Sequence, residues 1–198
     1  IFTADDLTIA ALAVVLIAYY LCTRGIFQGK ASGDGYLGFM FLQGIFIHHS
    51  LDLAVSAPEY GPILGREITG HVANPCPIGP VLLWAPPYLL GLLFKKGLLF
   101  LAKLVTLPRA LVAQLPLRPV AAHGPFDYFM AGLGAFFAGL CGIALLFKLL
   151  RRRFSVFAGR YAAITAVLAT PILFYLVTQP LYQHASAFFV VTLFVERW

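Results

Sequence analysis

Long apolar runs alternate with short charged segments along the chain. The runs cover about residues 5–23, 126–150 and 156–178, and a further run begins at 185–198. A helix that crosses the hydrocarbon core of a bilayer needs ~20 predominantly apolar residues. The pattern therefore predicts three transmembrane helices and the start of a fourth, with a kink at Pro171 in the third.

Composition agrees with this pattern. Hydrophobic side chains make up 61% of the 198 residues and charged side chains 11%, whereas soluble domains carry about 25% charged residues. The net charge of +6 comes from Lys and Arg beside the apolar runs, without a basic patch on a polar face. This distribution is typical of membrane topology and argues against a nucleic-acid partner. We therefore expect an all-α integral membrane protein in contact with membrane lipids.

Charged residues inside the predicted spans are few, and they lie near the ends of the second span. They are Asp127 and Lys148, and at these positions no transport pathway is needed to explain them. The chain has three cysteines, at positions 22, 76 and 141. Their spacing is typical of neither a metal site nor a disulfide framework.

Two further apolar segments, residues 78–94 and 97–115, differ from the spans in their polar content. Prolines interrupt the first, and the second contains Lys103 and Arg109. A Lys or Arg at the centre of a span costs roughly 2.5–3.5 kcal/mol on insertion. We therefore expect both segments to lie in the interface as juxtamembrane amphipathic helices, with lysines, including Lys95 between the two segments, reaching the headgroups.

An arginine cluster sets the expected orientation. It occupies the predicted inner loop at residues 151–155 and continues to Arg160, and such clusters favour the cytoplasmic side. Residues 24–124 then form one long external loop. The alternative, in which 78–94 and 97–115 both cross, keeps the cluster inside but buries charge. We expect a single membrane domain over 1–198, either complete or a fragment of a longer chain, since it ends inside or just after an apolar run.

Asp34 is the most informative polar residue of this loop. It stands between Gly33 and Gly35 in "GKASGDGYLGF", shortly after the first predicted span. The glycines allow a sharp turn and a close approach to a ligand. A carboxylate at a lipid–water boundary suits proton abstraction from an acceptor hydroxyl. Equally, an Asp in this position is a good helix N-cap.

Other loop residues have similar pairs of interpretations. Glu59 in "SAPEYG" is a second acid or metal ligand, or else a solvated carboxylate. Arg66 is suited to bidentate phosphate binding, or to a salt bridge with Glu67. His71 lies in the same polar segment and joins Arg66 as a substrate-binding residue.

Aromatic residues give a weaker signal. Trp84 and Tyr60 fit a wall on which a sugar stacks, or an aromatic belt at the membrane surface. The sequence contains neither a set of two histidines and a carboxylate nor an Asp-x-Asp pair, so we predict no metal site. Dependence on a divalent metal stays open.

Three stretches in order resemble the N-terminal part of the GT-C superfamily of membrane glycosyltransferases. "GDGYLGFMFLQGIFIHHSLDL" resembles the opening of the first external loop, and "HVANPCPIGPVLLWAPPYLL" resembles its second juxtamembrane element. "RRRFSVFAGRYAAITAVLATPILFYLVTQPLYQHASAFFV" resembles the inner loop, third helix and second external loop. The resemblance covers nearly all of this chain and about the first third of a typical member.

The resemblance implies an activity and a site. The enzymes transfer a sugar from a polyprenyl-phosphate-linked donor, and the match assigns Asp34 as general base. It places His184, in "QPLYQHAS", near the active site, where it could bond a phosphate or an acceptor hydroxyl. The alternative for His184 is an interfacial histidine bonded to backbone or water. The resemblance further implies the bacterial inner membrane, with the 24–124 loop on the periplasmic side.

A second hypothesis comes from a different class of protein. The chain would be a truncated, non-catalytic relative that serves as a structural subunit of a larger membrane complex. Glycines of the second predicted span would then provide a packing face for other membrane subunits.

Overall fold

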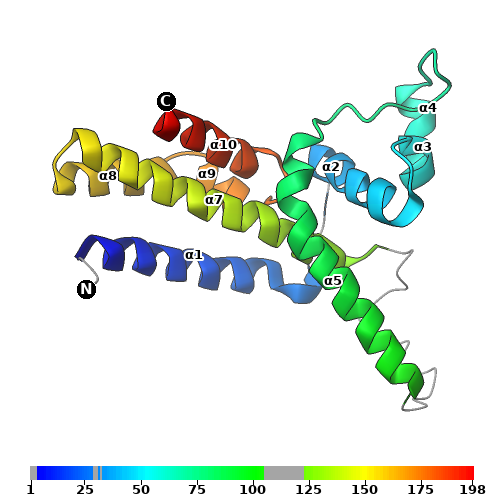
Figure 1. Ribbon diagram of the computed structural model, residues 1–198, viewed down its shortest axis with the longest axis horizontal. Helices are drawn as coiled ribbons and strands as arrows, with labels where there is room; N and C mark the ends of the chain where they lie inside the picture. The colour runs from blue at the N-terminus through cyan, green and yellow to red at the C-terminus, as the bar shows by residue number, and fades with distance from the viewer. Residues whose placement is uncertain (1–3, 29–30, 32, 105–122) are drawn as a thin grey trace. The chain divides into compact units, whose positions relative to one another are not determined.

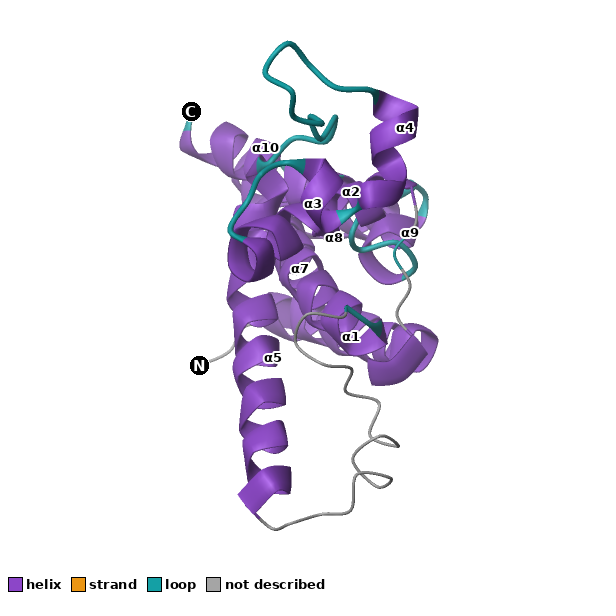
Figure 2. Ribbon diagram, turned by 90° about the vertical axis from the view of Figure 1, so that its right-hand side faces the viewer, coloured by secondary structure: helices purple, strands orange, loops and turns teal. Residues whose placement is uncertain are grey.

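The structure is a computed structural model that describes residues 4–28, 31, 33–104 and 123–198. Within these ranges the chain is helical with connecting loops and contains no strand (Figure 1, Figure 2). The chain divides into two compact units. The first comprises Ile1–Gly25 and Ala135–Trp198, and the second comprises Ile26–Gly134. The predicted all-α class is confirmed for the described residues.

The second unit contains the polar loop of the sequence. Its elements are, in order, α2 (Gly33–Gln43), a π-helical turn η1 (Gly44–His48), α3 (Leu53–Ser56), a 3₁₀ turn η2 (Pro58–Tyr60), α4 (Gly61–Leu64), α5 (Gly79–Leu104) and the start of α7 (Pro125–Arg153). Trp84 and Phe39 are fully buried and anchor its core. Gly38 allows α2 to approach the Trp84 ring, because an added Cβ would lie 3.0 Å from that ring.

The first unit contains α1 (Ala4–Gln28) as far as Gly25, the remainder of α7, α8 (Val156–Leu168), α9 (Ile172–Val177) and α10 (His184–Arg197). Tyr20 of α1 stacks on Phe136 of α7, with ring centroids 4.5 Å apart. Gly139 of α7 packs against Leu176 of α9, where a larger side chain would clash. Small residues thus allow close helix contact in this unit.

The kink predicted at Pro171 is a complete break. α8 ends at Leu168 and α9 begins at Ile172, with Pro171 as the N-cap residue of α9. The Thr170 hydroxyl donates to the Ala166 carbonyl and accepts from the Ile172 N–H, so it satisfies backbone groups at the break. The predicted span 156–178 is therefore two shorter helices.

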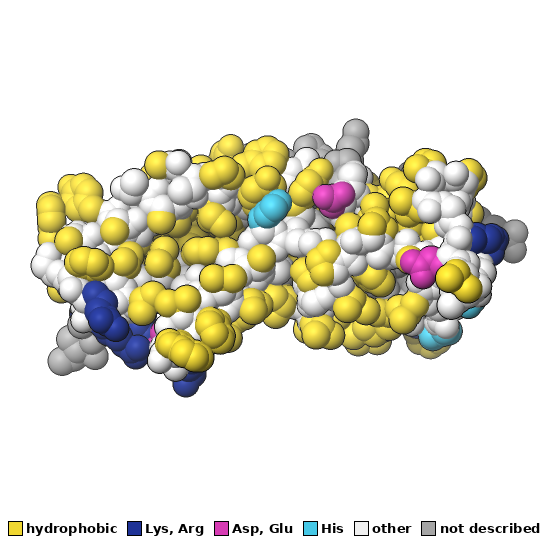
Figure 3. Space-filling view, turned by 90° about the horizontal axis from the view of Figure 1, so that it is seen from above, with side chains coloured by type: hydrophobic (Ala, Val, Ile, Leu, Met, Phe, Trp, Pro, Cys, Tyr) yellow, Lys and Arg dark blue, Asp and Glu magenta, His cyan; other side chains and the backbone are white. Residues whose placement is uncertain are grey.

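Two helices of the described residues are long and apolar enough to cross a membrane. They cover Gly79–Ala102 and Pro125–Arg153, while Leu7–Cys22 and Val156–Leu168 are apolar but shorter. Hydrophobic side chains predominate on the face in Figure 3, and charged ones gather in small groups. The coarse prediction, a helical chain with apolar helices long enough for a membrane, is supported. Three full spans and a partial fourth are not confirmed.

α5 differs from the two interfacial helices predicted at 78–94 and 97–115. It is one continuous helix of 26 residues that includes Pro86 and Pro87. Lys95 lies within this helix, buried and paired with Asp127, so its side chain does not extend to the headgroups. Residues 105–115, including Arg109, lie outside the described residues.

Candidate functional site

The first turn of α2 carries Asp34. Gly33 precedes it with φ of 52°, a left-handed conformation that glycine adopts without strain. The Asp34 side chain is exposed, and a carboxylate in this turn interacts favourably with the positive end of the helix dipole. Asp34 is therefore accessible to a ligand and also placed where an acid stabilises the helix.

The segment "NPCPIGP" packs against this turn. The Asn74 side-chain amide donates to the Leu37 carbonyl at 2.7 Å, and the Cys76 thiol donates to the Asp34 carbonyl at 3.5 Å. Asn74 also accepts from the Cys76 N–H at 3.0 Å, which shapes the loop that makes both contacts. Two of the three sequence stretches that carry the resemblance therefore meet at Asp34, although they lie about 40 residues apart.

Tyr36 links the same turn to Glu59 and Tyr60. Its hydroxyl donates to Glu59 Oε1 at 2.9 Å, and its ring stacks on Tyr60 at 5.9 Å. Burial, followed by the hydrogen bond to the Glu59 carboxylate, raises the pKa of Tyr36 well above its usual range. Tyr36 therefore stays protonated as a donor, and Glu59 is held near α2 instead of being a free loop carboxylate.

Asp52 and His71 form a second polar group in the loop. Asp52 Oδ2 lies 3.0 Å from His71 Nδ1, while Oδ1 accepts from the Ala54 and Val72 N–H groups at 2.9 and 3.0 Å. The His71 contact, together with these backbone donors, lowers the pKa of Asp52 to about 2. Asp52 thus caps α3 and fastens the loop segment at Val72 to it. The His71 ring is oriented by Asp52 and is 69% exposed.

Arg66 hydrogen-bonds to the backbone of its own loop. Its Nη1 donates to the Gly70 carbonyl at 2.6 Å, closing the short loop between them. The guanidinium is exposed, so its remaining donors are accessible to solvent. The phosphate-binding role of Arg66 is untested by this arrangement.

Trp84 is buried in the core and does not form an open wall on which a sugar could stack. Its side chain is 0% exposed and packs in the core between α2 and α7. Gln43 and Tyr88 lie in the same buried region, where the Gln43 amide donates to the Tyr88 hydroxyl at 2.7 Å. Contact of Trp84 with a sugar would require the helices to separate.

A buried ion pair joins α5 and α7. Lys95 Nζ lies 2.8 Å from Asp127 Oδ1 and 2.9 Å from Oδ2, and the two side chains are 1% and 3% exposed. Asp127 Oδ2 also accepts from the Gly124 N–H at 2.9 Å. From sequence, Asp127 is expected at a span end and Lys95 in the interface. Their pairing is not expected from sequence, because no local spacing connects residues 32 positions apart.

His184 belongs to the first unit, whereas Asp34 belongs to the second. It begins α10, is exposed, and its ring lies 4.0 Å from that of Tyr175. The two rings border a shallow groove that Thr170 and Pro171 also line. Within its own unit, His184 is therefore accessible beside an aromatic ring.

Among the described residues, no group of three or more His, Cys, Asp or Glu side chains is arranged to hold a metal ion. In comparisons with known proteins, no family model, no curated protein and no solved structure matches the chain.

Proposed function

We propose that the chain is a GT-C-like membrane glycosyltransferase, or the N-terminal portion of one, with Asp34 as general base. A polyprenyl-phosphate-linked sugar is the donor, and a hydroxyl group of a lipid, glycan or protein is the acceptor. In this proposal α1, α7 and the α8–α9 pair cross the bacterial inner membrane, α10 begins a fourth span, and residues 24–124 are external.

The observation that carries the proposal is the meeting of two loop segments at Asp34. The segment from Asn74 to Cys76 hydrogen-bonds to the carbonyls of Leu37 and Asp34 itself. It thereby fixes the backbone of the first turn of α2 while the Asp34 carboxylate stays exposed. A positioned but accessible carboxylate is what general-base catalysis requires.

The chemical step is an inverting displacement. The Asp34 carboxylate takes the proton of the acceptor hydroxyl while the hydroxyl oxygen attacks the anomeric carbon of the sugar. The bond from that carbon to the phosphate oxygen breaks, and polyprenyl phosphate leaves on the opposite face. Glu59, held by Tyr36, and Tyr60 border the same turn, where they can orient the acceptor. Arg66 and His71 supply accessible donors for phosphate elsewhere in the loop.

Substitution of Asp34 by Asn in the full natural protein tests the proposal. Asn has nearly the same shape as Asp, so the variant keeps the turn, apart from the roughly 0.3–1 kcal/mol typical of a charge–dipole interaction at a helix N-terminus, but loses the base. We expect sugar transfer from a polyprenyl-phosphate donor in membranes to fall by ~10²–10⁴-fold at unchanged expression. Glu67→Gln, another exposed acid of the same loop, is the matched control and should retain activity.

Two outcomes count against the proposal. Unchanged transfer in Asp34→Asn would leave Asp34 as a helix-stabilising residue only. Absence of transfer by the unmodified protein, together with co-purification in a larger membrane complex, would favour the non-catalytic subunit.

A further inference from the structure

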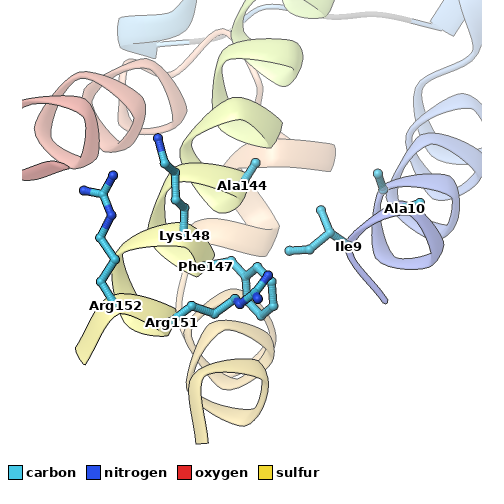
Figure 4. A pocket seen from close by; sticks show the side chains of 8 residues that line it. Ile9, Ala10, Ala144, Phe147, Lys148, Arg151 and Arg152 are labelled. Carbon is cyan, nitrogen blue, oxygen red and sulfur yellow. The ribbon is translucent and has the colours of Figure 1, made fainter. Parts of the chain in front are cut away.

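A cleft opens within the first unit between α1 and the last turns of α7 (Figure 4). Its volume is about 640 Å³, which is within the usual range of ligand pockets, roughly 300–1,000 Å³. One wall is apolar and comes mainly from Ile9, Ala10 and Ala13 of α1. The opposite wall is cationic, with Lys148, Arg151 and Arg152 of α7.

The cations are held in place and remain accessible. Glu196 of α10 accepts from Lys148 Nζ at 2.8 Å and from Arg152 Nη2 at 3.1 Å. Glu196 is only 4% exposed, whereas Lys148 and Arg152 are 56% and 52% exposed. One buried carboxylate thus orients two cations without covering them, and the described lining of the cleft contains no acid.

Arg151 contributes a third cation by a different route. Its guanidinium lies 5.7 Å from the centre of the Phe147 ring, which also lines the cleft. Figure 4 shows Arg151 and Phe147 extending from α7 on the side toward Ile9 of α1. The cleft therefore combines an aromatic and aliphatic floor with positive charge at the end of an apolar helix.

We infer that this cleft binds an anionic phospholipid of the membrane, with the phosphate at Lys148, Arg151 and Arg152 and an acyl chain along the apolar wall of α1. Charge complementarity selects an anion, because basic pockets at membrane helix ends bind acidic headgroups. The apolar wall selects a lipid over a free phosphate, since a soluble anion would leave it unused. The inference rests on the membrane insertion proposed above, but not on glycosyl transfer.

The test compares lipid binding by the purified full protein in mixed micelles of phosphatidylglycerol or phosphatidylcholine, with inorganic phosphate as competitor. We expect preferential binding of phosphatidylglycerol. Arg151→Gln should weaken this binding about fivefold, the loss of one cationic contact with an acidic lipid. Arg153→Gln, which removes an equal charge from the same turn but outside the cleft lining, should change it much less.

Ala10→Phe separates the two sources of phosphate. The Phe side chain would occupy the part of the cleft along α1 where the acyl chain lies, without a change in charge, so it should weaken phosphatidylglycerol binding. Three results would overturn the inference. The two Arg variants could weaken binding equally, or the protein could bind both lipids equally. Alternatively, Ala10→Phe could leave binding unchanged while inorganic phosphate displaces the lipid. Asp34→Asn should bind the lipid normally, which separates a failure here from a failure of the proposed catalysis.

Discussion

Removal of the positive partner of the buried Lys95–Asp127 pair should destabilise the second unit strongly. Asp127 is 3% exposed, so Lys95→Met would remove the counter-charge of a buried carboxylate and leave it, among the described residues, with its hydrogen bond from the Gly124 N–H. Leaving one charge of a buried pair uncompensated costs about 3–5 kcal/mol. In a chain of 150–250 residues, each kcal/mol lowers the melting temperature by ~2–4 °C. We therefore expect a fall of roughly 6–20 °C.

The assay is thermal unfolding of the full protein in detergent. Lys96→Met is the matched control, because Lys96 is the next residue of α5 and is exposed. It should change the free energy of unfolding by no more than ~0.5 kcal/mol.

A double-mutant cycle separates pairing from packing. Asp127→Asn should also be costly, because it leaves the Lys95 ammonium buried without a counter-charge. The double variant Lys95→Met/Asp127→Asn removes both charges and keeps an acceptor for Gly124. It should cost no more than either single variant, which gives a coupling on the order of 3 kcal/mol. Additive effects, or equal losses in Lys95→Met and Lys96→Met, would refute the reasoning.

Two further predictions concern close packing and the loop. Gly134→Ala places a Cβ 2.7 Å from the Trp84 Cα, so the free energy of unfolding should fall by about 1–3 kcal/mol in a thermal-unfolding assay. In the control Gly97→Ala the added Cβ meets nothing within 4 Å, so this variant should be neutral or slightly stabilising. Equal effects of the two variants would contradict the packing at Gly134. Because the pKa of Asp52 is lowered from 3.8 to about 2, its contribution to loop order is complete above pH 3.8 and is lost as the pH falls through about 2. Pepsin should therefore cleave the loop of the unmodified protein increasingly as the pH falls from 3.8 to about 2. The variant Asp52→Ala should be cleaved readily over the whole range. Digestion of the unmodified protein that does not depend on pH would contradict the role of Asp52.

Local pattern was enough to predict part of the fold. The apolar run of α7 identifies one long helix, because length and hydropathy are properties of contiguous residues. The glycines beside Asp34 indicate a turn, and the structure has a left-handed Gly33 there. The break at Pro171 follows from the missing N–H of proline, although the pattern indicated a kink and the structure has a full interruption.

Long-range contacts account for what the sequence did not predict. Trp84 reads as an interfacial aromatic residue, and only the approach of Gly38 and Gly134 makes it part of the core. Lys95 reads as a headgroup-facing lysine until α7 brings Asp127 within 2.8 Å. Such pairings depend on which helices meet, which no local spacing specifies.

The sequence by itself determined the helical class, the apolar character and the exposed carboxylate of the loop. These follow from side-chain chemistry and from periodicity over neighbouring residues. Only the tertiary structure decided that α5 is one helix containing a buried charge, that Glu59 is bound by Tyr36, and that His71 is oriented by Asp52. The physical reason is that the cost of burying a polar group depends on the partner it meets, and the partner is supplied by the fold.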